Sequence, residues 1–303
     1  MTVTILMATF NGAAYLPDQL DSLLAQSHGD WRLLASDDGS SDATANMLRA
    51  FGRAHPQHFA GLLQGPRRGS AANFLSLVCH PDLPPGPVAF CDQDDVWLRG
   101  KLARALRRIG AQPDDRPVIY AAESWLADDR LRLLRRSKAG ASPGFANALV
   151  QNLCAGHTIV LNKAAVELAR RAGNPPGIAF HDWWLYQLVT GAGGVCLLDP
   201  TPVALYRQHE ANALGAPGGL AAMVRRADLT LGRNYAIWMG AHHQALAETG
   251  LMTPDAMAML RPLTETPAVA GINRARLFRR IGLYRSGRFG TAALCCAAMF
   301  GRA

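Results

Sequence analysis

Long apolar runs are absent from this 303-residue sequence. No stretch of about 18 consecutive uncharged apolar residues occurs, so we expect no transmembrane helix. The opening residues, MTVTILMA, place no basic residue ahead of the apolar run, unlike a secretory signal peptide. We therefore expect a cytoplasmic protein.

Paired cysteines are absent too. Six cysteines are present, but none forms a CxxC pair and none has zinc-ligand spacing to a histidine. This pattern indicates buried thiols in a reducing compartment. An internal repeat and a long low-complexity linker are also missing, which excludes a repeat array.

The residues that are present favour a folded domain that meets anions. Hydrophobic residues make up 49% of the chain, enough for a core, and the net charge is +8. Such a charge attracts nucleotide diphosphates, nucleic acid or an anionic membrane surface. The length fits one large α/β domain, alone or with a helical appendage.

The segment PVAFCDQDDVW, residues 87–97, is the clearest candidate site. Its apolar residues predict a short buried strand, and Asp92, Asp94 and Asp95 follow at the carboxyl end. Carboxylates this close repel one another unless a cation lies between them, and hard oxygen ligands suit Mg²⁺ or Mn²⁺. The alternatives are a solvated acidic turn, or a turn in which Asp95 caps the helix that contains Lys101 and Leu102.

Alternating strand and helix patterns precede this segment. Residues 3–8 and 31–36 are predicted strands, and helices are predicted at about 13–26 and after residue 42. This alternation predicts a parallel sheet with right-handed crossovers, whose ligands bind at the carboxyl ends of the strands. That edge would hold Thr9, Asp37, Asp38 and Asp92.

Two loops at that edge carry polar side chains. Asp37 and Asp38 lie in a tight turn and can accept hydrogen bonds from a base or ribose, with a solvated turn as the alternative. Residues 65–73 form a basic loop ahead of a helix. Its arginines Arg67 and Arg68 suit an anion or a base edge, unless they are simply solvated.

Four motifs resemble glycosyltransferase family 2, and most of all its bacterial rhamnosyltransferase branch. They are TFNG at 9–12, DDGSSD at 37–42, Arg68-Gly69 with Asn73, and DQDDVW at 92–97, and the match covers residues 2–215. The resemblance implies an inverting enzyme of the α/β class with the GT-A fold. Its nucleotide-sugar-binding domain, a mostly parallel sheet flanked by helices, would span residues 1–216, and a helical region would span 217–303.

The same resemblance implies the donor and metal sites. Mg²⁺ or Mn²⁺ would be held by Asp94, Asp92 and His209, with Asp94 as the first choice for a direct ligand. A small residue at Gly156 lets the donor sugar approach the backbone, and the neighbouring His157 is interpreted as a satisfied, partly buried histidine. The expected nucleotide-sugar contacts are Thr9, Phe10, Asn11, Asp37, Asp38, Arg68, Asn73, Asp92, Gln93, Gly156 and Arg207.

Residues 178–189 place Asp182 among aromatic residues at a predicted helix start. By the resemblance, Asp182 matches the acidic residue that serves as catalytic base; the alternative is an N-cap or first-turn aspartate. Trp183 and Trp184 are expected to bind the acceptor and exclude water, with a place in the core as the alternative.

Residues 202–215 are predicted to begin as an edge strand that ends in YRQH, and they resemble a signature of the rhamnosyltransferase branch that continues to Asn212 and Gly215. Arg207 would contact phosphate and His209 would be the third protein ligand of the metal, although both are also ordinary strand-end residues.

Residues 124–145 are expected to form a mobile loop beside the acceptor site, or a solvated insertion.

The last region is rich in arginine, with helices predicted at about 219–249, 253–266, 272–286 and 289–300. One interpretation is a bundle packed on the catalytic domain. The other is a basic amphipathic surface in peripheral contact with the inner face of the plasma membrane. The two interpretations are compatible.

The predicted function is therefore an inverting, metal-dependent glycosyltransferase. It would use dTDP-L-rhamnose or a UDP-sugar and extend a surface glycan that can be lipid-linked. One alternative is a nucleotidyltransferase of similar fold, but TFNG is not a Gly-rich, Lys-containing phosphate loop. Another is a nucleic-acid-binding protein, which would need base-stacking aromatic residues among its basic patches, so we expect no nucleic acid partner.

Overall fold

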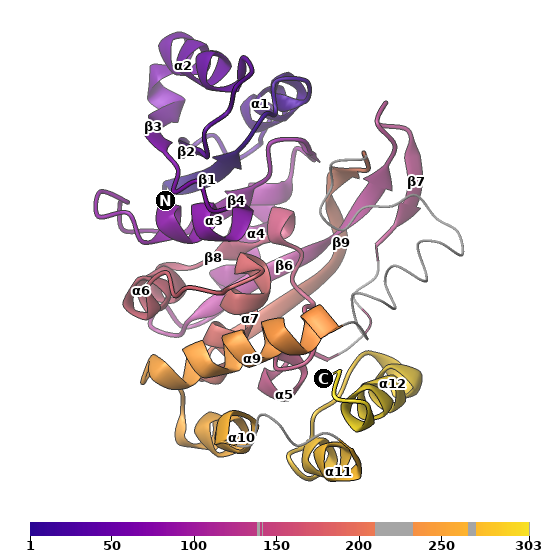
Figure 1. Ribbon diagram of the computed structural model, residues 1–303. Helices are drawn as coiled ribbons and strands as arrows, with labels where there is room; N and C mark the ends of the chain where they lie inside the picture. Colours follow the sequence, from indigo (N-terminus) through magenta and orange to yellow (C-terminus); the bar gives the residue numbers. More distant parts are fainter. Residues whose placement is uncertain (138–139, 141, 210–232, 266–270, 303) are drawn as a thin grey trace.

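The computed structural model describes residues 1–137, 140, 142–209, 233–265 and 271–302. Its centre is one sheet with the strand order β3-β2-β1-β4-β8-β6-β9-β5, and β7 pairs with β6 outside this path (Figure 1). The strands are β1 (Val3–Thr9), β2 (Trp31–Asp37), β3 (Phe59–Gln64), β4 (Val88–Cys91), β5 (Val96–Trp97), β6 (Val118–Ala127), β7 (Leu133–Arg136), β8 (Val160–Leu161) and β9 (Val195–Arg207).

The sheet is mostly parallel. β1 pairs in parallel with β2 and β4, and β2 pairs in parallel with β3, as the strand and helix alternation predicts. β8 runs antiparallel to both β4 and β6, while β9 is parallel to β6 and antiparallel to β5. The predicted mixed α/β architecture is confirmed.

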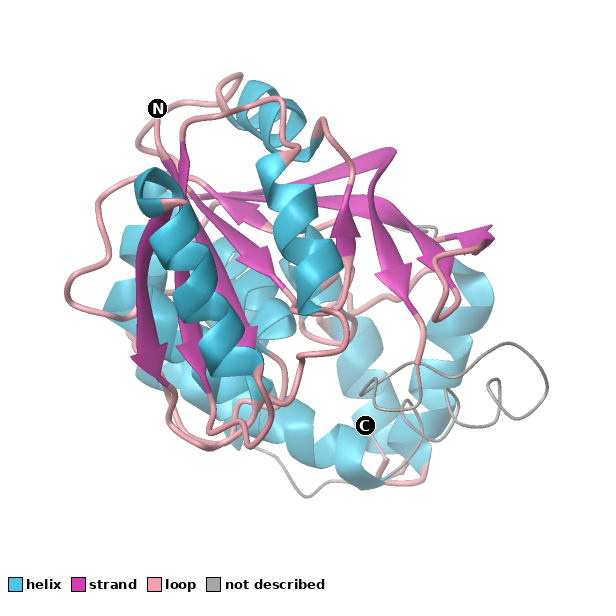
Figure 2. Cartoon of the chain, turned by 90° about the horizontal axis from the view of Figure 1, so that it is seen from above, coloured by secondary structure: helices cyan, strands magenta, loops and turns pink. Residues whose placement is uncertain are grey.

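Helices cover both faces of the sheet (Figure 2). Along β1, Ile5 and Met7 join one buried cluster and Leu6 joins another, because successive side chains of a strand point to opposite faces. The Ile5 face is covered by α1 (Leu16–Leu24), α2 (Thr44–Ala54) and α4 (Lys101–Ile109), and the Leu6 face by α3 (Ser70–Val78), α6 (Lys163–Ala172) and α7 (His181–Gly191). A strand buried on both faces is apolar throughout, which explains the unbroken apolar run.

Short elements complete this part of the chain. They are the 3₁₀ helices η1 (Pro56–His58) and η2 (Gly156–Thr158) and the short helix α5 (Phe145–Ala148). The predicted first helix begins later than expected, at Leu16, with Pro17 in its first turn, where a missing N–H costs nothing.

Two local predictions are wrong. Residues 202–207 do not form an edge strand, because they belong to β9, which lies between β6 and β5. Residues 124–145 are not a loop throughout, because β6 continues to Ala127 and β7 folds back on it antiparallel. Long-range strand pairing thus orders a stretch that lacked a clear local pattern.

The C-terminal helices are α9 (Arg233–Glu248), α10 (Pro254–Glu265), α11 (Ile272–Arg280) and α12 (Gly287–Met299). Phe278 and Leu294 share one buried cluster with Trp184 of α7, so one face of this region packs on the sheet domain as the bundle interpretation predicts. α9 runs beside α7, and α12 lies at the periphery near the C-terminus (Figure 1). α9 lies within the helix predicted at about 219–249. The 216–217 boundary and the part of that predicted helix before residue 233 lie outside the described residues. Among the described helices, none is long and apolar enough to cross a membrane.

Candidate active site

The ends of three parallel strands lie together. Thr9 at the end of β1 pairs with Asp37 at the end of β2, and Thr9 Oγ1 donates to Asp37 Oδ2 at 2.9 Å. Cys91 at the end of β4 pairs with Met7 of β1, which brings Asp92 to the same edge. The first loop, the Asp37–Asp38 turn and the acidic turn are therefore neighbours.

The carboxylates of Asp37 and Asp38 shape this edge. Asp37 accepts hydrogen bonds from the Ser40 hydroxyl at 2.6 Å and the Ser40 N–H at 2.8 Å. Burial raises the pKa of Asp37, but these hydrogen bonds outweigh it and leave the pKa below its usual value. Asp38 accepts from the backbone N–H groups of Arg67 at 2.6 Å and Gly69 at 2.9 Å. Asp38 still has lone pairs for a ligand, whereas Asp37 accepts four hydrogen bonds from the protein and holds the turn in shape.

Gln93 joins the acidic turn to the first loop. Phe10 N–H donates to Gln93 Oε1 and Gln93 Nε2 donates to the Phe10 carbonyl, both at 2.9 Å. A Cβ on Gly12 would lie 2.2 Å from Gln93 Oε1, so this clamp requires glycine there. Asn11 adopts a left-handed φ of 48° and accepts from Ser41 N–H at 2.9 Å. Hydrogen bonds thus link Phe10 of the first loop to Gln93 of the acidic turn, and Asn11 links the same loop to Ser41. All three residues are expected contacts of the donor.

Asn73 and Arg68 occupy different environments. Asn73 is only 1% exposed and donates from Nδ2 to the Ser36 carbonyl at 3.0 Å. Its Nδ2 supports the end of β2, while its buried Oδ1 has no partner among the described residues, so the expected contact with the nucleotide stays a prediction. Arg68 is exposed just ahead of α3, where its guanidinium can reach an anion.

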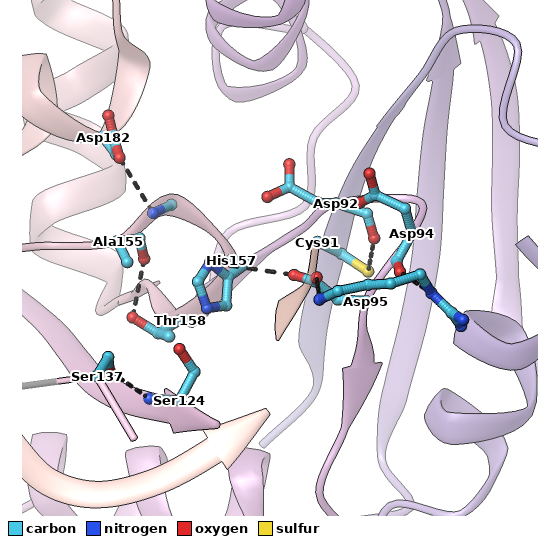
Figure 3. A network of polar contacts seen from close by, with 12 residues as sticks. Cys91, Asp92, Asp94, Asp95, Ser124, Ser137, Ala155, His157, Thr158 and Asp182 are labelled. Carbon is cyan, nitrogen blue, oxygen red and sulfur yellow. Dashed lines mark hydrogen bonds and ion pairs between the residues drawn. The ribbon is translucent and has the colours of Figure 1, made fainter. Parts of the chain in front are cut away.

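The three acids of the central turn diverge (Figure 3). Asp94 Oδ2 lies 2.8 Å from His209 Nε2. Asp95 is fully buried and accepts from Arg207 N–H at 3.2 Å through Oδ1, while its Oδ2 has no partner among the described residues. α4 begins only at Lys101, so the alternative in which Asp95 caps that helix is wrong.

A divalent cation fits this acidic turn. Ligand atoms of Asp92, Asp95 and His157 all lie within 4.8 Å of one another. Burial, then repulsion from Asp94 and Asp182, raises the pKa of Asp92 to about 7, and burial with the neighbouring acids raises the pKa of Asp95 well above its usual range. Buried carboxylates that repel one another, one with an unpaired oxygen, match the oxygen donors that Mg²⁺ and Mn²⁺ prefer.

Sequence reasoning missed the buried Lys101. Its ammonium lies 3.1 Å from the centre of the Trp97 ring and donates to the His157 carbonyl. Burial lowers the pKa of Lys101 to about 7. The only signal in the sequence was a lysine at a predicted helix start soon after the acids.

His157 was also misjudged. Its ring stacks on Tyr206 with centroids 4.6 Å apart, and Nδ1 lies 4.0 Å from Asp95 Oδ2. Its buried Nε2 has no partner within the described part of the chain, so the interpretation as a satisfied histidine is wrong. Nδ1, the ring nitrogen beside the Asp95 carboxylate, is available as a ligand.

Asp182 lies on the other side of η2 from the acidic turn (Figure 3). Its carboxylate accepts from Trp183 N–H at 2.7 Å and from Gly156 N–H at 3.1 Å. Burial raises the pKa of Asp182 to about 6 despite these hydrogen bonds. A half-buried carboxylate of this pKa is ionised at neutral pH and can still take a proton, as a general base must.

The structure explains why position 156 is a glycine, which the sequence did not reveal. A Cβ at Gly156 would lie 3.0 Å from His181 Nε2 and 3.6 Å from Asp182 Cβ. The His181 ring in turn packs on Phe74, with centroids 4.2 Å apart. Glycine therefore allows η2 to approach the start of α7 and donate to Asp182.

Trp183 and Trp184 lie in the core. Trp184 is fully buried, and Trp183 is 4% exposed and donates from Nε1 to the Ala148 carbonyl at 2.7 Å. The expected acceptor surface is corrected here, because neither ring presents a face to solvent. Both instead anchor α7, which carries Asp182.

Arg207 is a buried strut. Its guanidinium donates to the Asp94 carbonyl at 2.9 Å, to the Asp129 carbonyl at 2.6 Å and to Asp18 Oδ2 at 2.7 Å. The expected phosphate contact is corrected, since these three partners hold a side chain only 3% exposed as a residue. Tyr15, next to this strut, stacks on His209 with centroids 4.7 Å apart. Arg207 and Tyr15 thus position the Asp94–His209 pair.

Comparison with known proteins agrees with this geometry. Residues 4–144 match the model of glycosyl transferase family 2. The dTDP-rhamnosyl transferase RfbG of Shigella flexneri is 27% identical over 243 residues, which cover 76% of this chain and 80% of RfbG. Residues 4–144 therefore form a glycosyl transferase family 2 domain. A chain with this domain is a glycosyltransferase, which replaces the alternatives of a nucleotidyltransferase and a nucleic-acid-binding protein.

Two further proteins are similar to this family 2 enzyme. The UDP-Glc:alpha-D-GlcNAc-diphosphoundecaprenol beta-1,3-glucosyltransferase WfgD of Escherichia coli is 27% identical over 100 residues, 33% of this chain and 38% of WfgD. The solved structure of mannosyltransferase PcManGT from Pyrobaculum calidifontis, in complex with GDP-Man and Mn²⁺, superposes with a TM-score of 0.55 at 18% identity. It covers 99% of this chain and 86% of PcManGT, and it confirms the GT-A fold.

Proposed function

We propose that this family 2 enzyme is an inverting, divalent-metal-dependent glycosyltransferase that moves L-rhamnose from dTDP-L-rhamnose to a hydroxyl of a glycan acceptor. Its products would be cell-surface polysaccharides, and its place of action the cytoplasm. The similarity to a dTDP-rhamnosyl transferase supports the donor, and the similarity to WfgD supports a lipid-linked acceptor.

One observation carries the proposal. The carboxylate of Asp182 and the acidic turn at Asp92 and Asp94 lie on opposite sides of η2, and Gly156 N–H of that turn orients Asp182. Direct displacement with inversion requires a base and a diphosphate site on opposite sides of the anomeric carbon, because the acceptor oxygen attacks that carbon from the side opposite the leaving diphosphate. Asp182 and the acidic turn are two separate carboxylate sites that lie close enough to influence each other, as a sugar bound between them requires. A base and a diphosphate site on one side would not serve such a reaction.

The proton moves to Asp182. As the acceptor oxygen bonds to the anomeric carbon, its hydroxyl proton becomes acidic and passes to Asp182, while the bond between that carbon and the phosphate oxygen breaks. The electron pair of that bond leaves with the nucleoside diphosphate. Asp182 then returns its proton to solvent, and the glycan is one sugar longer with its anomeric configuration inverted.

The acidic turn would hold the cation that the diphosphate needs. Asp94 and His209 form one pair of ligands, and Asp92 with Asp95 and His157 offers a second, more buried set. A bound Mg²⁺ or Mn²⁺ supplies positive charge that stabilises the departing diphosphate. Lys101 lowers the repulsion among the carboxylates from beneath the turn.

The nucleotide would lie along the ends of β1 and β2. Thr9, Asp37 and Asp38 line that edge, and Arg68 lies on the adjacent loop. Phe10 is 56% exposed there and offers an aromatic face to a base.

The test is a donor screen. The purified chain is incubated with dTDP-L-rhamnose, UDP-glucose, UDP-GlcNAc or GDP-mannose, with and without Mn²⁺, and the released nucleoside diphosphate is quantified with and without a diphospholipid-linked glycan. Turnover of dTDP-L-rhamnose alone among these donors is expected. Preference for a UDP- or GDP-sugar would overturn the donor, and retention of the anomeric configuration in the product would overturn the mechanism.

A further inference from the structure

Helix α12 exposes a face on which none of the described side chains is polar. Phe289 is 93% exposed and Phe300, just past the helix end, is 78% exposed. The other exposed residues between them are Ala292, Ala293, Cys296 and Met299. Their spacing from Phe289 is 3, 4, 7 and 10 residues, and that of Phe300 is 11, which places them along one side of a helix.

The opposite side of α12 already packs on the protein. Leu294, Ala297 and Ala298 are buried in the cluster that also contains Phe278 of α11. The exposed apolar face therefore cannot turn inward without losing these contacts. A helix that is apolar on both sides needs a second apolar surface to cover it.

The charge of the residues around α12 indicates which kind of surface covers its exposed apolar face. Residues 271–303 contain seven arginines and no aspartate or glutamate. Arg276, Arg279 and Arg280 are exposed on α11, and their spacing of 3 and 4 residues places them on one face. α11 lies beside α12 at the periphery of the molecule (Figure 1).

We propose that α11 and α12 form a docking surface for an anionic lipid bilayer. Phe289 and Phe300 would enter the acyl region from the two ends of α12, and the arginines of α11 would meet phosphate groups of the lipid heads. α12 has 13 residues and lies in the plane of the interface, because it is too short to cross a bilayer. A second copy of the chain fits this surface less well, since a two-fold contact would bring the two arginine sets together.

Hydrogen bonds join the docking surface to the segment that precedes η2 in the active site. Tyr284, between α11 and α12, donates to the Ser142 carbonyl at 3.0 Å, and Asn147 donates to the Tyr284 carbonyl at 3.0 Å. Ser286 N–H donates to Gln151 Oε1 at 2.7 Å. These contacts tie the surface to the segment that leads into η2 and Asp182. Docking would therefore orient the base relative to the bilayer, a consequence that rests on the proposed lipid-linked acceptor, whereas docking itself does not.

The experiment is vesicle co-sedimentation of the full chain. Vesicles of equal parts phosphatidylglycerol and phosphatidylcholine are compared with pure phosphatidylcholine at low and high salt. We expect binding to the anionic vesicles that weakens with salt. Phe289→Ser with Phe300→Ser should weaken it at least about tenfold, and Arg276→Gln with Arg279→Gln and Arg280→Gln by roughly 100-fold, about a factor of five for each arginine.

Matched controls separate docking from folding and from catalysis. Ile237→Ser changes an apolar side chain that is 64% exposed on α9 and should leave binding unchanged. Both sets of variants should keep the wild-type Tm and the wild-type release of nucleoside diphosphate from the donor without vesicles. A donor preference other than dTDP-L-rhamnose would leave the docking result intact.

Three results would overturn the proposal. They are equal binding to neutral and anionic vesicles, unchanged binding by both sets of variants, and a concentration-dependent dimer that the two Phe→Ser changes abolish. The last is measured by analytical ultracentrifugation without vesicles, and it would assign the apolar face to a second copy of the chain.

Discussion

Asp94 and His209 are 115 residues apart in the sequence, yet Asp94 Oδ2 lies 2.8 Å from His209 Nε2. Asp94 follows β4, and His209 follows β9. Arg207 fixes their approach, because it donates to the Asp94 carbonyl from the end of the same strand that leads to His209. The pair offers one oxygen and one nitrogen to a cation, which makes it the first place to test metal dependence.

Asp94→Asn should abolish turnover and most of the divalent-dependent binding of nucleoside diphosphate. The substitution keeps the shape of the side chain but removes its negative charge, which a hard cation requires. Titration calorimetry with dTDP, with and without Mn²⁺, measures the effect. Asp115→Asn, a change at an exposed acid, is the control. Wild-type turnover in EDTA would contradict the prediction.

Asp182→Asn should lower kcat by about 10²–10⁴, the usual contribution of a general base. Donor affinity should stay nearly unchanged, because the acidic turn that would hold the metal and the diphosphate belongs to a different segment of the chain. Steady-state kinetics with the donor varied separate the two effects. Glu123→Gln is the control, since Glu123 forms an ion pair with Arg136. Loss of donor binding with kcat intact would make Asp182 a structural acid.

The pH dependence follows from the raised pKa of Asp182, about 6. The base must be ionised to accept a proton, so kcat should fall as the pH drops through about 6. Between pH 7 and pH 5 the ionised fraction falls about tenfold, and kcat at saturating Mn²⁺ should follow it. The residual activity of Asp182→Asn should lack this inflection. A wild-type profile that is flat between pH 5 and pH 7 would contradict the assignment.

Gly156→Ala should lower kcat by roughly tenfold, because the new Cβ would lie 3.0 Å from His181 Nε2 and displace the start of α7. The same change in a His181→Ala background should cost much less, since the clashing ring is gone. This double-mutant cycle measures the contact directly. Equal losses in both backgrounds would instead indicate that the methyl group meets the donor sugar.

Arg207→Met should lower the free energy of unfolding by about 2–4 kcal/mol, because it removes a buried guanidinium that donates to two partly buried carbonyls and to Asp18. Arg68→Met is the matched change at an exposed arginine. It should shift stability by less than about 0.5 kcal/mol while weakening nucleotide binding. Urea denaturation and dTDP titration of both variants distinguish a strut from a phosphate ligand. Weakened dTDP binding with normal stability in Arg207→Met would contradict the strut.

The sequence by itself determined the order of strands and helices around β1, β2 and β4, and the place of the acids at a strand end. These features are local, since apolar periodicity reports which face of an element is buried. The motif order also determined the family. Short-range patterns and motif spacing are thus readable without knowledge of the fold.

Only the tertiary structure decided which polar groups are buried and what they meet. Trp183 and Trp184 directly follow the candidate base in sequence, yet both lie in the core. Arg207 is buried and donates to two backbone carbonyls and to the Asp18 carboxylate. Asp95 and His157 come together from separate elements, with His157 Nδ1 4.0 Å from Asp95 Oδ2. The physical reason is that burial depends on neighbours supplied by distant parts of the chain, so residues of one local pattern can end in the core or at the site.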